Sequence, residues 1–414
     1  MNILFCMSYP RAAANILPAV LELCTNHQMY FFQYRKMASH FPFGGAGVDT
    51  RPDMIRALLK AGATNLGEAS QAHSNTADTY SIDFKQATKH LPIDLAIFDE
   101  NVGKLRWGTP LLYSILKRRG IPVVGCQEGC VENDTAGLQR QALNLGICYD
   151  YALCIGNYDH SCLLKHNPNL EKRLFAVGLP SNDQLGTIDH KLLQNKKHIL
   201  LVPSWTKLSG KEGRFKAMTD EVIEQSGIYT LARNKNISIV IKEKSKASQE
   251  YAFKHLETET VRVTMDETET NNLIARAKYV IGAPSTLLLK PLQLGIPVVV
   301  LSEPYMGQFG VFQQYNGLTP LNQDKILQSF SEQERQPYKD LEFIEKAIAG
   351  GSDFSCTQKF CQAIENILMA GSTYQGPIKS PLPGVKGYLL RYPRTQSFLT
   401  SQYARIKKWM LTQP

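Results

Sequence analysis

The chain lacks any apolar run long enough to cross a membrane. A membrane-spanning helix needs about 20 consecutive apolar residues, and no stretch of the 414 residues comes close to that length. An apolar segment, Asn2–Cys6, begins at once and no basic leader precedes it. We therefore expect a cytoplasmic protein, which leaves room for a peripheral contact with the inner face of the cell membrane.

Several motifs that define large enzyme classes are also absent. The sequence has no P-loop, no dinucleotide-binding glycine fingerprint and no nucleophile elbow. The glycine-rich stretch at 44–47 neither follows a strand directly nor leads into a clear helix. There is no helix-turn-helix signature and no stripe of interleaved basic and aromatic residues, so we expect no nucleic-acid partner.

Cysteine usage argues against disulfides and against zinc. Nine cysteines is an odd number for a disulfide framework, and several lie inside apolar runs, where a thiol behaves as a small hydrophobic group. Cys126 and Cys130 are four residues apart, but no second Cys or His pair follows at metal-ligand spacing. We expect reduced thiols and no metal.

The composition is that of a folded protein with more than one domain. Hydrophobic residues make up 43% of the chain and charged residues 20%. A length of 414 residues suits two domains, each with its own core. The net charge of +9 favours an anionic ligand or an anionic membrane surface.

Strand and helix patterns alternate twice along the chain, which predicts parallel sheets covered by helices on both faces. A first domain is predicted over 1–188 and a second over 197–370, with polar residues 189–197 as the linker. Strands are predicted in the first domain at Ile3–Met7, Met29–Gln33, Leu95–Asp99, Ile121–Gly125, Tyr151–Ile155 and Leu174–Val177. In the second they are predicted at Ile199–Pro203, Ile237–Lys242, Val261–Thr264, Tyr279–Ile281 and Val298–Leu301. The fold class is α/β, with two Rossmann-like domains facing a cleft.

Helices are predicted between these strands, among them Lys216–Arg233, Gln249–Leu256 and Thr286–Leu294. A last helix near Cys356–Met369 is assigned to the second domain. Residues 371–414 form a tail that is first rich in Pro and Gly and then basic. Tyr403, Ile406 and Trp409 fall at helical spacing there, so a basic amphipathic helix could lie on an anionic membrane or pack across the first domain.

The most informative segment is the turn Gly282–Thr286, between a strand and a helix. It places two hydroxyls, of Ser285 and Thr286, where the helix begins. Unpaired N–H groups and the positive end of the helix dipole favour an anion at that position. A phosphate-bearing ligand is the functional interpretation, and a simple N-cap is the structural one.

Ligands of open α/β sheets bind beyond the carboxyl ends of the strands. Three further strand ends of the second domain are polar, and they supply hydroxyls, ammonium groups and a carboxylate. These candidates for donor binding are Ser204, Thr206, Lys242, Lys244, Glu267 and Thr268. Lys242 and Lys244 would neutralise a diphosphate if they face the ligand; otherwise they are solvated surface charges.

In the first domain, Glu128 follows a buried strand. A partly desolvated carboxylate at that point has a raised pKa and suits a general base. Asp99 and Asp134 are further catalytic candidates, at the neighbouring strand end and shortly after Glu128. The alternatives are a loop cap for Asp99 and an ion pair with an arginine for Glu128. Asp183 caps a following helix or lies at a hinge between the domains.

Four segments together resemble the GT-B group of nucleotide-sugar enzymes. Ile121–Gly129, Val177–Leu185, Ile199–Thr206 and Ala283–Gly295 are similar to segments of UDP-N-acetylglucosamine 2-epimerases, CDP-glycerol glycerophosphotransferases and capsule or lipopolysaccharide transferases. The resemblance covers roughly residues 1–370.

The resemblance implies a role for several residues. Glu128 would be the base, Ser285 and Thr286 would contact the donor phosphates, and Glu267 or Thr268 would lie near the nucleotide. It also implies a metal-independent reaction without a cofactor. Two positions depart from the group: Lys242-Glu-Lys-Ser245 stands where many members carry Lys-x-His-Pro, and Lys290 stands where many carry a ribose-binding glutamate.

These observations predict a glycosyltransferase of bacterial surface polysaccharide or glycolipid synthesis. Its donor would be a UDP-, CMP- or CDP-linked sugar bound by the second domain, with Lys290 among the donor-binding residues, and a glycan or lipid-linked acceptor would bind the first domain. A nucleotide-sugar epimerase or a glycerophosphotransferase of the same fold is an alternative. The two departures keep a non-catalytic nucleotide-sugar binding module open as well.

Overall fold

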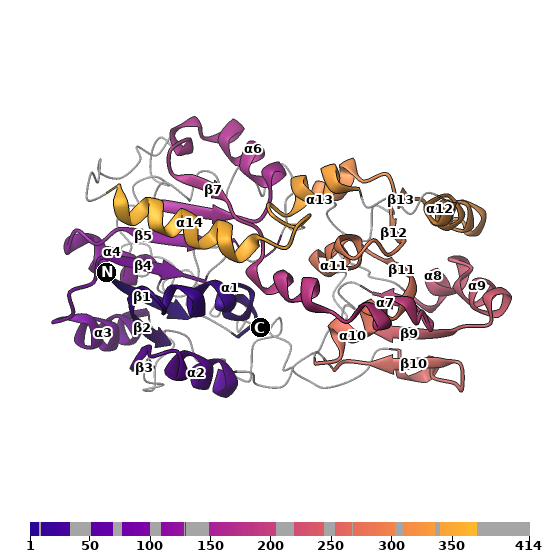
Figure 1. Cartoon of the computed structure of the whole chain (residues 1–414), viewed down its shortest axis with the longest axis horizontal. Helices are drawn as coiled ribbons and strands as arrows, with labels where there is room; N and C mark the ends of the chain where they lie inside the picture. The colour runs from indigo at the N-terminus through magenta and orange to yellow at the C-terminus, as the bar shows by residue number, and fades with distance from the viewer. Residues whose placement is uncertain are drawn as a thin grey trace, which may run out of the picture.

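A computed structural model shows two parallel sheets, each covered by helices on both faces (Figure 1). The structure describes residues 1–7, 10–33, 51–68, 77–99, 109–127, 129, 149–203, 219–243, 253–266, 268–302, 310–335 and 340–370.

The first sheet has seven parallel strands in the order β3-β2-β1-β4-β5-β6-β7. Its strands are short apolar runs buried on both faces, as expected for a parallel sheet with helices above and below. They are β1 (Asn2–Met7), β2 (Gln28–Gln33), β3 (Thr64–Glu68), β4 (Leu95–Phe98), β5 (Val123–Cys126), β6 (Tyr151–Cys154) and β7 (Leu174–Ala176).

Two separate clusters of buried side chains hold helices against this sheet. One face is covered by α1, α2 and α14, and the other by α3, α4 and α6. The bounds of these helices are α1 (Pro10–Leu23), α2 (Arg51–Lys60), α3 (Ala77–Thr88), α4 (Thr109–Arg118), α6 (Asn157–His166) and α14 (Cys356–Met369).

The second sheet has six parallel strands in the order β10-β9-β8-β11-β12-β13. Its strands are β8 (His198–Val202), β9 (Ser238–Lys242), β10 (Val261–Thr264), β11 (Ala277–Gly282), β12 (Val298–Leu301) and β13 (Leu318–Thr319). One face packs against α10, α11 and α13, and the other against α8, α9 and α12. These helices are α8 (Asp220–Gln225), α9 (Ile228–Lys235), α10 (Thr270–Ala275), α11 (Leu289–Gln293), α12 (Gln323–Arg335) and α13 (Leu341–Ala347).

Short helical turns complete the described chain. The linker expected over 189–197 contains a short helix, α7 (His190–Gln194), which the Asp189 carboxylate caps. The 3-10 turns are η1 (Pro168–Leu170), η2 (Pro180–Thr187), η3 (Lys254–Leu256), η4 (Thr286–Leu288) and η6 (Gly310–Gln314).

Within the described residues, the chain crosses between the two sheets twice. The first crossing runs through η2 after β7, and the second leads from α13 back to α14. Helix α14 packs on α1 and joins the core of the first sheet through Phe360, Ile364 and Ile367 (Figure 1). The assignment of this helix to the second domain was therefore wrong, because its apolar face completes the core of the first one.

The predicted strand positions agree with the structure to within two residues. One predicted helix, Lys216–Arg233, is divided in its described part: Gly227 adopts φ +71° between α8 and α9. A left-handed residue ends a helix, and glycine adopts that conformation without steric cost. The part of Gln249–Leu256 that the structure describes is the 3-10 turn η3 rather than an α-helix. Both the basic tail, 371–414, and the glycine-rich stretch at 44–47 lie outside the described residues.

Candidate functional site

Four neighbouring strands of the second sheet end at one edge. The register pairs Thr264 with Lys242, Ile241 with Leu201 and Val202 with Gly282, so β10, β9, β8 and β11 finish side by side. Adjacent strands lie about 4.8 Å apart, which separates the ends of β9 and β11 by about 10 Å. The four strand ends therefore share one edge of the sheet.

Ser285 and Thr286 are half-buried at this edge, so neither residue is enclosed in the packed core. Ser285 is the N-cap: its hydroxyl accepts a hydrogen bond from the N–H of Leu287 at 3.3 Å. The predicted N-cap is thus present, and phosphate binding by this serine stays a prediction. The helix that follows begins as the 3-10 turn η4 and continues as α11, which has five residues. A helix of that length has a weaker dipole than the sequence suggested, so hydroxyls and backbone N–H groups would have to supply most of any anion binding.

Lys242 is a buried cation at the end of β9, and only 3% of its surface is exposed. Its ammonium donates to the backbone carbonyl of Glu243 at 2.9 Å. The carboxylate of Glu243 accepts from the N–H of Phe253 at 2.7 Å. The interpretation of Lys242 as a solvated surface charge was wrong, because its side chain is buried at the end of β9.

Thr268 lies four residues after the end of β10 and is exposed. Its hydroxyl and its backbone N–H both donate to the Asp266 carboxylate, at 2.7 and 2.8 Å. These bonds lower the pKa of Asp266, and the charge of Lys242 adds to the effect. Asp266 thus stays ionised beside a buried lysine, and the edge carries both signs of charge.

Lys290 lies on α11, one turn after Thr286. Its ammonium donates to the side-chain oxygen of Asn271, on α10, at 3.0 Å. The lysine therefore joins two helices that cover the same face of the sheet. Ser204, Thr206, Lys244 and Glu267, the remaining predicted donor-binding residues, lie outside the described residues.

A buried glutamine that sequence analysis did not single out organises the end of β5. The side-chain oxygen of Gln127 accepts from the N–H of Ile155 at 3.0 Å. Its amide nitrogen donates to the carbonyl of Gly129 at 3.0 Å and to the carboxylate of Asp159 at 2.9 Å. The residues on both sides of position 128 are therefore held in place. Glu128 and Asp134 themselves lie outside the described residues.

The two sheets approach each other at Gly129. A β-carbon built on this glycine would lie 3.3 Å from the hydroxyl oxygen of Thr286. Gly129 directly follows Glu128 in the sequence, and Thr286 belongs to the predicted phosphate-binding turn. The structure thus brings the first-domain segment with the candidate base against the second-domain segment with the candidate anion site.

Asp99 is buried at the end of β4, with 1% of its surface exposed. Burial raises the pKa of the thiols of Cys6 and Cys126, and the neighbouring Asp99 carboxylate raises it further. Both cysteines belong to the strands on either side, so Asp99 lies in the edge of the first sheet among protonated thiols. Its surroundings are those of a buried carboxylate within the sheet, and its catalytic role stays a prediction.

Buried polar groups also connect the two domains away from this edge. Asn182, in η2, donates to the side-chain oxygen of Gln293 at 2.7 Å, and Gln293 donates to the carbonyl of Gly351 at 3.0 Å. The Asp183 carboxylate accepts from the N–H groups of Cys356 and Thr357, at 3.0 and 2.6 Å. Asp183 is thus a helix cap, as one interpretation predicted, but for a helix 173 positions further along the chain.

Among the described residues, no group of three His, Cys, Asp or Glu side chains is arranged to hold a metal ion. Within the same ranges, no helix is both long and apolar enough to cross a membrane.

No family model and no curated protein matches this chain. Solved structures do resemble it. The UDP-GlcNAc 2-epimerase from Neisseria meningitidis bound to UDP-GlcNAc is 15% identical, with a TM-score of 0.59 over 89% of this chain and 100% of that one. The glycotransferase of kitacinnamycin is 13% identical, with a TM-score of 0.53 over 89% and 99%. The wall teichoic acid polymerase TagF, in its H444N variant, is 12% identical, with a TM-score of 0.52 over 89% of each chain.

The neighbours include UDP-GlcNAc 2-epimerases, a glycosyltransferase and a teichoic acid polymerase, all of the GT-B fold. The predicted fold class is therefore confirmed: this chain has the GT-B fold, with two parallel α/β sheets.

Proposed function

We propose that this protein is a metal-independent glycosyltransferase that moves a sugar from a nucleotide-sugar donor to an acceptor in bacterial surface glycan synthesis. The observation that carries the proposal is the approach of Gly129 to Thr286, because it joins the segment of the candidate base to the candidate phosphate-binding turn. The GT-B fold supports the same substrate class, since structures of that fold with UDP or UDP-GlcNAc bound are among those that resemble it.

In this proposal the donor diphosphate lies along the edge formed by β9, β8 and β11. Ser285 and Thr286 contact the phosphates through hydroxyls and backbone N–H groups. Lys242 contributes a positive charge from beneath, and such fixed groups stabilise a leaving diphosphate without reorganising during the reaction. Glu128 accepts the proton of the attacking acceptor hydroxyl, so the sugar–phosphate bond breaks as the new glycosidic bond forms.

A nucleotide-sugar 2-epimerase is the second candidate. The epimerase from Neisseria meningitidis has a TM-score of 0.59, compared with 0.52 and 0.53 for the two transferase structures. The epimerase reaction needs no acceptor, which makes the two candidates separable by product analysis.

The deciding experiment incubates the purified protein with UDP-, CMP-, CDP- and GDP-linked sugars, with and without glycan or lipid-linked acceptors. Nucleotide that is released only when an acceptor is present supports transfer. An isomerised donor formed without an acceptor identifies an epimerase. Thermal stabilisation by a donor without any turnover identifies a binding module.

The role of Glu128 is tested by Glu128→Gln, which keeps the size of the side chain and removes its basicity. We expect turnover to fall by at least about 100-fold, the usual contribution of a general base, while donor affinity is retained. Glu171→Gln, at an exposed position after η1, is the matched control and should keep full activity. Equal rates in the wild type and Glu128→Gln would remove this residue from the mechanism.

The acceptor side and the place of the protein in the cell belong to the same proposal. The basic tail, 371–414, would bring the enzyme to the inner face of the membrane, where a lipid-linked acceptor is exposed. Vesicle sedimentation of the full chain, with anionic or with neutral lipids, measures this contact. Binding that disappears when residues 403–414 are deleted would support it.

A further inference from the structure

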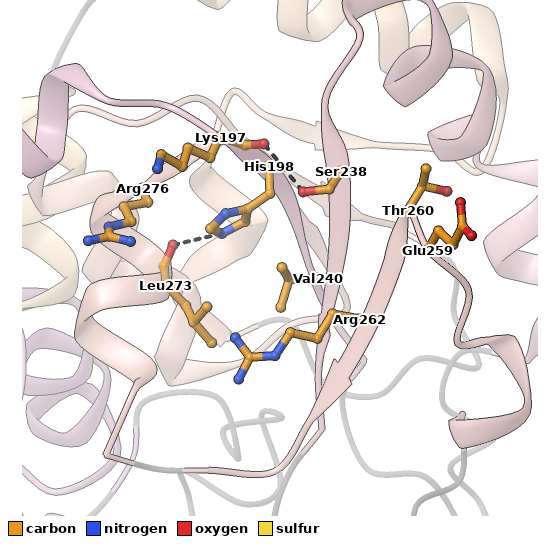
Figure 2. Close-up of a pocket in the computed structure, with 9 residues that line it drawn as sticks. All are labelled: Lys197, His198, Ser238, Val240, Glu259, Thr260, Arg262, Leu273 and Arg276. Atoms are coloured by element: carbon orange, nitrogen blue, oxygen red, sulfur yellow. Dashed lines mark hydrogen bonds between the residues drawn. The ribbon is translucent and has the colours of Figure 1, made fainter.

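A pocket of about 290 Å³ opens at the amino ends of the strands of the second sheet (Figure 2). It lies at the starts of β8, β9 and β10 and against α10. Val240, the third of the five residues of β9, is the lining residue deepest in the sheet, and it lies two residues, about 7 Å, from Lys242 at the carboxyl end, while the pocket opens at the opposite, amino end. It is therefore separate from the proposed donor site.

The floor of this pocket is apolar and its walls are cationic. Val240 and Leu273 supply the apolar surface, and Lys197, Arg262 and Arg276 supply the positive charges. In Figure 2 the guanidinium of Arg262 reaches from β10 toward α10, and Lys197 and Arg276 extend on the side of the pocket nearest α10. Three long cationic side chains thus surround a site large enough for a small organic molecule.

Negative charges at the pocket do not balance these cations. Glu269 forms an ion pair with Arg262 at 2.6 Å, and Glu259 lines the side next to β10. Within the described part of the chain, Lys197 and Arg276 make no ion pair. An anion that bound between them would meet two cations not yet neutralised by the protein.

His198 lies at the back of the pocket and reports its electrostatics. Its Nε2 donates to the carbonyl of Leu273 at 2.9 Å, because a carbonyl can only accept. Burial and, to a smaller extent, the charges of Arg276, Arg262 and Lys196 together lower the pKa of His198 to about 4. The ring is therefore neutral, and its Nδ1 keeps an unprotonated lone pair in a field of positive charge.

We propose that this pocket is a second binding site, for a small molecule that carries a phosphate group on an apolar body. Arg276 holds the phosphate through its planar donor fork, which matches the phosphate oxygens, and Lys197 binds it as a second cation, while Arg262, paired with Glu269, adds charge. Val240 and Leu273 contact the apolar part of the ligand. The site does not depend on the proposed transferase activity, since it lies at the other end of the sheet.

Phenyl phosphate is a suitable probe because it combines a dianion with an apolar ring. NMR spectra of the histidine side chains, with His198 assigned by comparison with His198→Gln, follow its binding to the full chain. We expect a saturable shift of the His198 resonances and a rise in the pKa of His198, because a bound dianion favours the imidazolium. Benzoate and inorganic phosphate should bind at least about tenfold more weakly, since each lacks one of the two features.

The double variant Lys197→Gln with Arg276→Gln removes the two cations that make no ion pair and should weaken phenyl phosphate binding by at least about tenfold. Both side chains are exposed, so the fold is retained, which thermal unfolding checks. Arg233→Gln, on an exposed position of α9, is the matched control and should bind like the wild type. No saturable shift of His198 in the wild type, or equal binding by the double variant, would overturn the proposal.

Discussion

Asp183 offers a test of how the second crossing of the chain is held in place. Helix α14 begins after Ser355, whose own side chain makes no capping bond. The Asp183 carboxylate supplies the cap instead, through the N–H groups of Cys356 and Thr357. Asp183→Ala therefore leaves two donors of a 14-residue helix without their acceptor and removes a negative charge from the positive end of its dipole.

The expected cost follows from these two contributions. A lost cap destabilises a helix by about 1 kcal/mol, and a lost charge at the first turn by up to about 1 kcal/mol more. A total near 2 kcal/mol corresponds to an increase of about 30-fold in the population of states in which the start of α14 is open. Asp183→Asn keeps an acceptor oxygen without the charge, so its effect should be about half as large in free energy.

Cys356 makes this opening measurable, because its side chain is fully buried at the first turn of α14. Burial raises the pKa of this thiol, so it reacts only after the helix start opens. Labelling with a thiol reagent, read out by peptide mass spectrometry, should be about 30-fold faster at Cys356 in Asp183→Ala. Cys154, in β6, is the internal control. A change of less than about threefold, or an equal effect of Asp183→Asn, would refute this account of the cap.

Three further predictions concern packing, hydrogen bonding and charge. Gln127→Leu breaks a buried bond to the Asp159 carboxylate and two backbone bonds, and should lower the free energy of unfolding by about 3 kcal/mol in urea titration. Gly125→Ala places a methyl group 2.7 Å from the Tyr149 ring. The free energy of unfolding should therefore fall by about 1–3 kcal/mol, which a thermal unfolding experiment would show as a lower melting temperature. The pKa of His198 is lower in the folded state, about 4, than the ordinary 6.5, so the unfolded state binds more protons between these values. Stability should therefore fall by about 3 kcal/mol as the pH drops from 6.5 to 4, and His198→Gln should lose that part of the pH dependence.

The sequence predicted those strands best whose apolar residues are continuous. Val298–Leu301 has the predicted bounds, because a strand buried on both faces needs an uninterrupted apolar run. Strand β3, Thr64–Glu68, was missed because it is mostly polar and lies at the edge of the sheet. Strand β13 has only two residues, too few for any periodicity.

Contacts between residues that are far apart in the sequence could not be predicted from local sequence patterns. The apolar spacing of α14 gives its helical state but not which sheet it covers, and chain order suggested the wrong one. Gln127 stands beside a predicted base, yet its three bonds involve backbone and side-chain groups up to 32 positions away. The burial of Lys242 likewise follows from its place between two strands and not from its neighbours in sequence.

The two crossings in the described part of the chain limit how the domains can move. With a single connection, one domain could rotate relative to the other about several axes. Two connections, at η2 and between α13 and α14, define a line, and rotation about that line is the motion that stretches neither. Opening and closing about this axis would change the separation of Gly129 and Thr286 without unfolding either sheet, so a single angle would set the distance between the two segments.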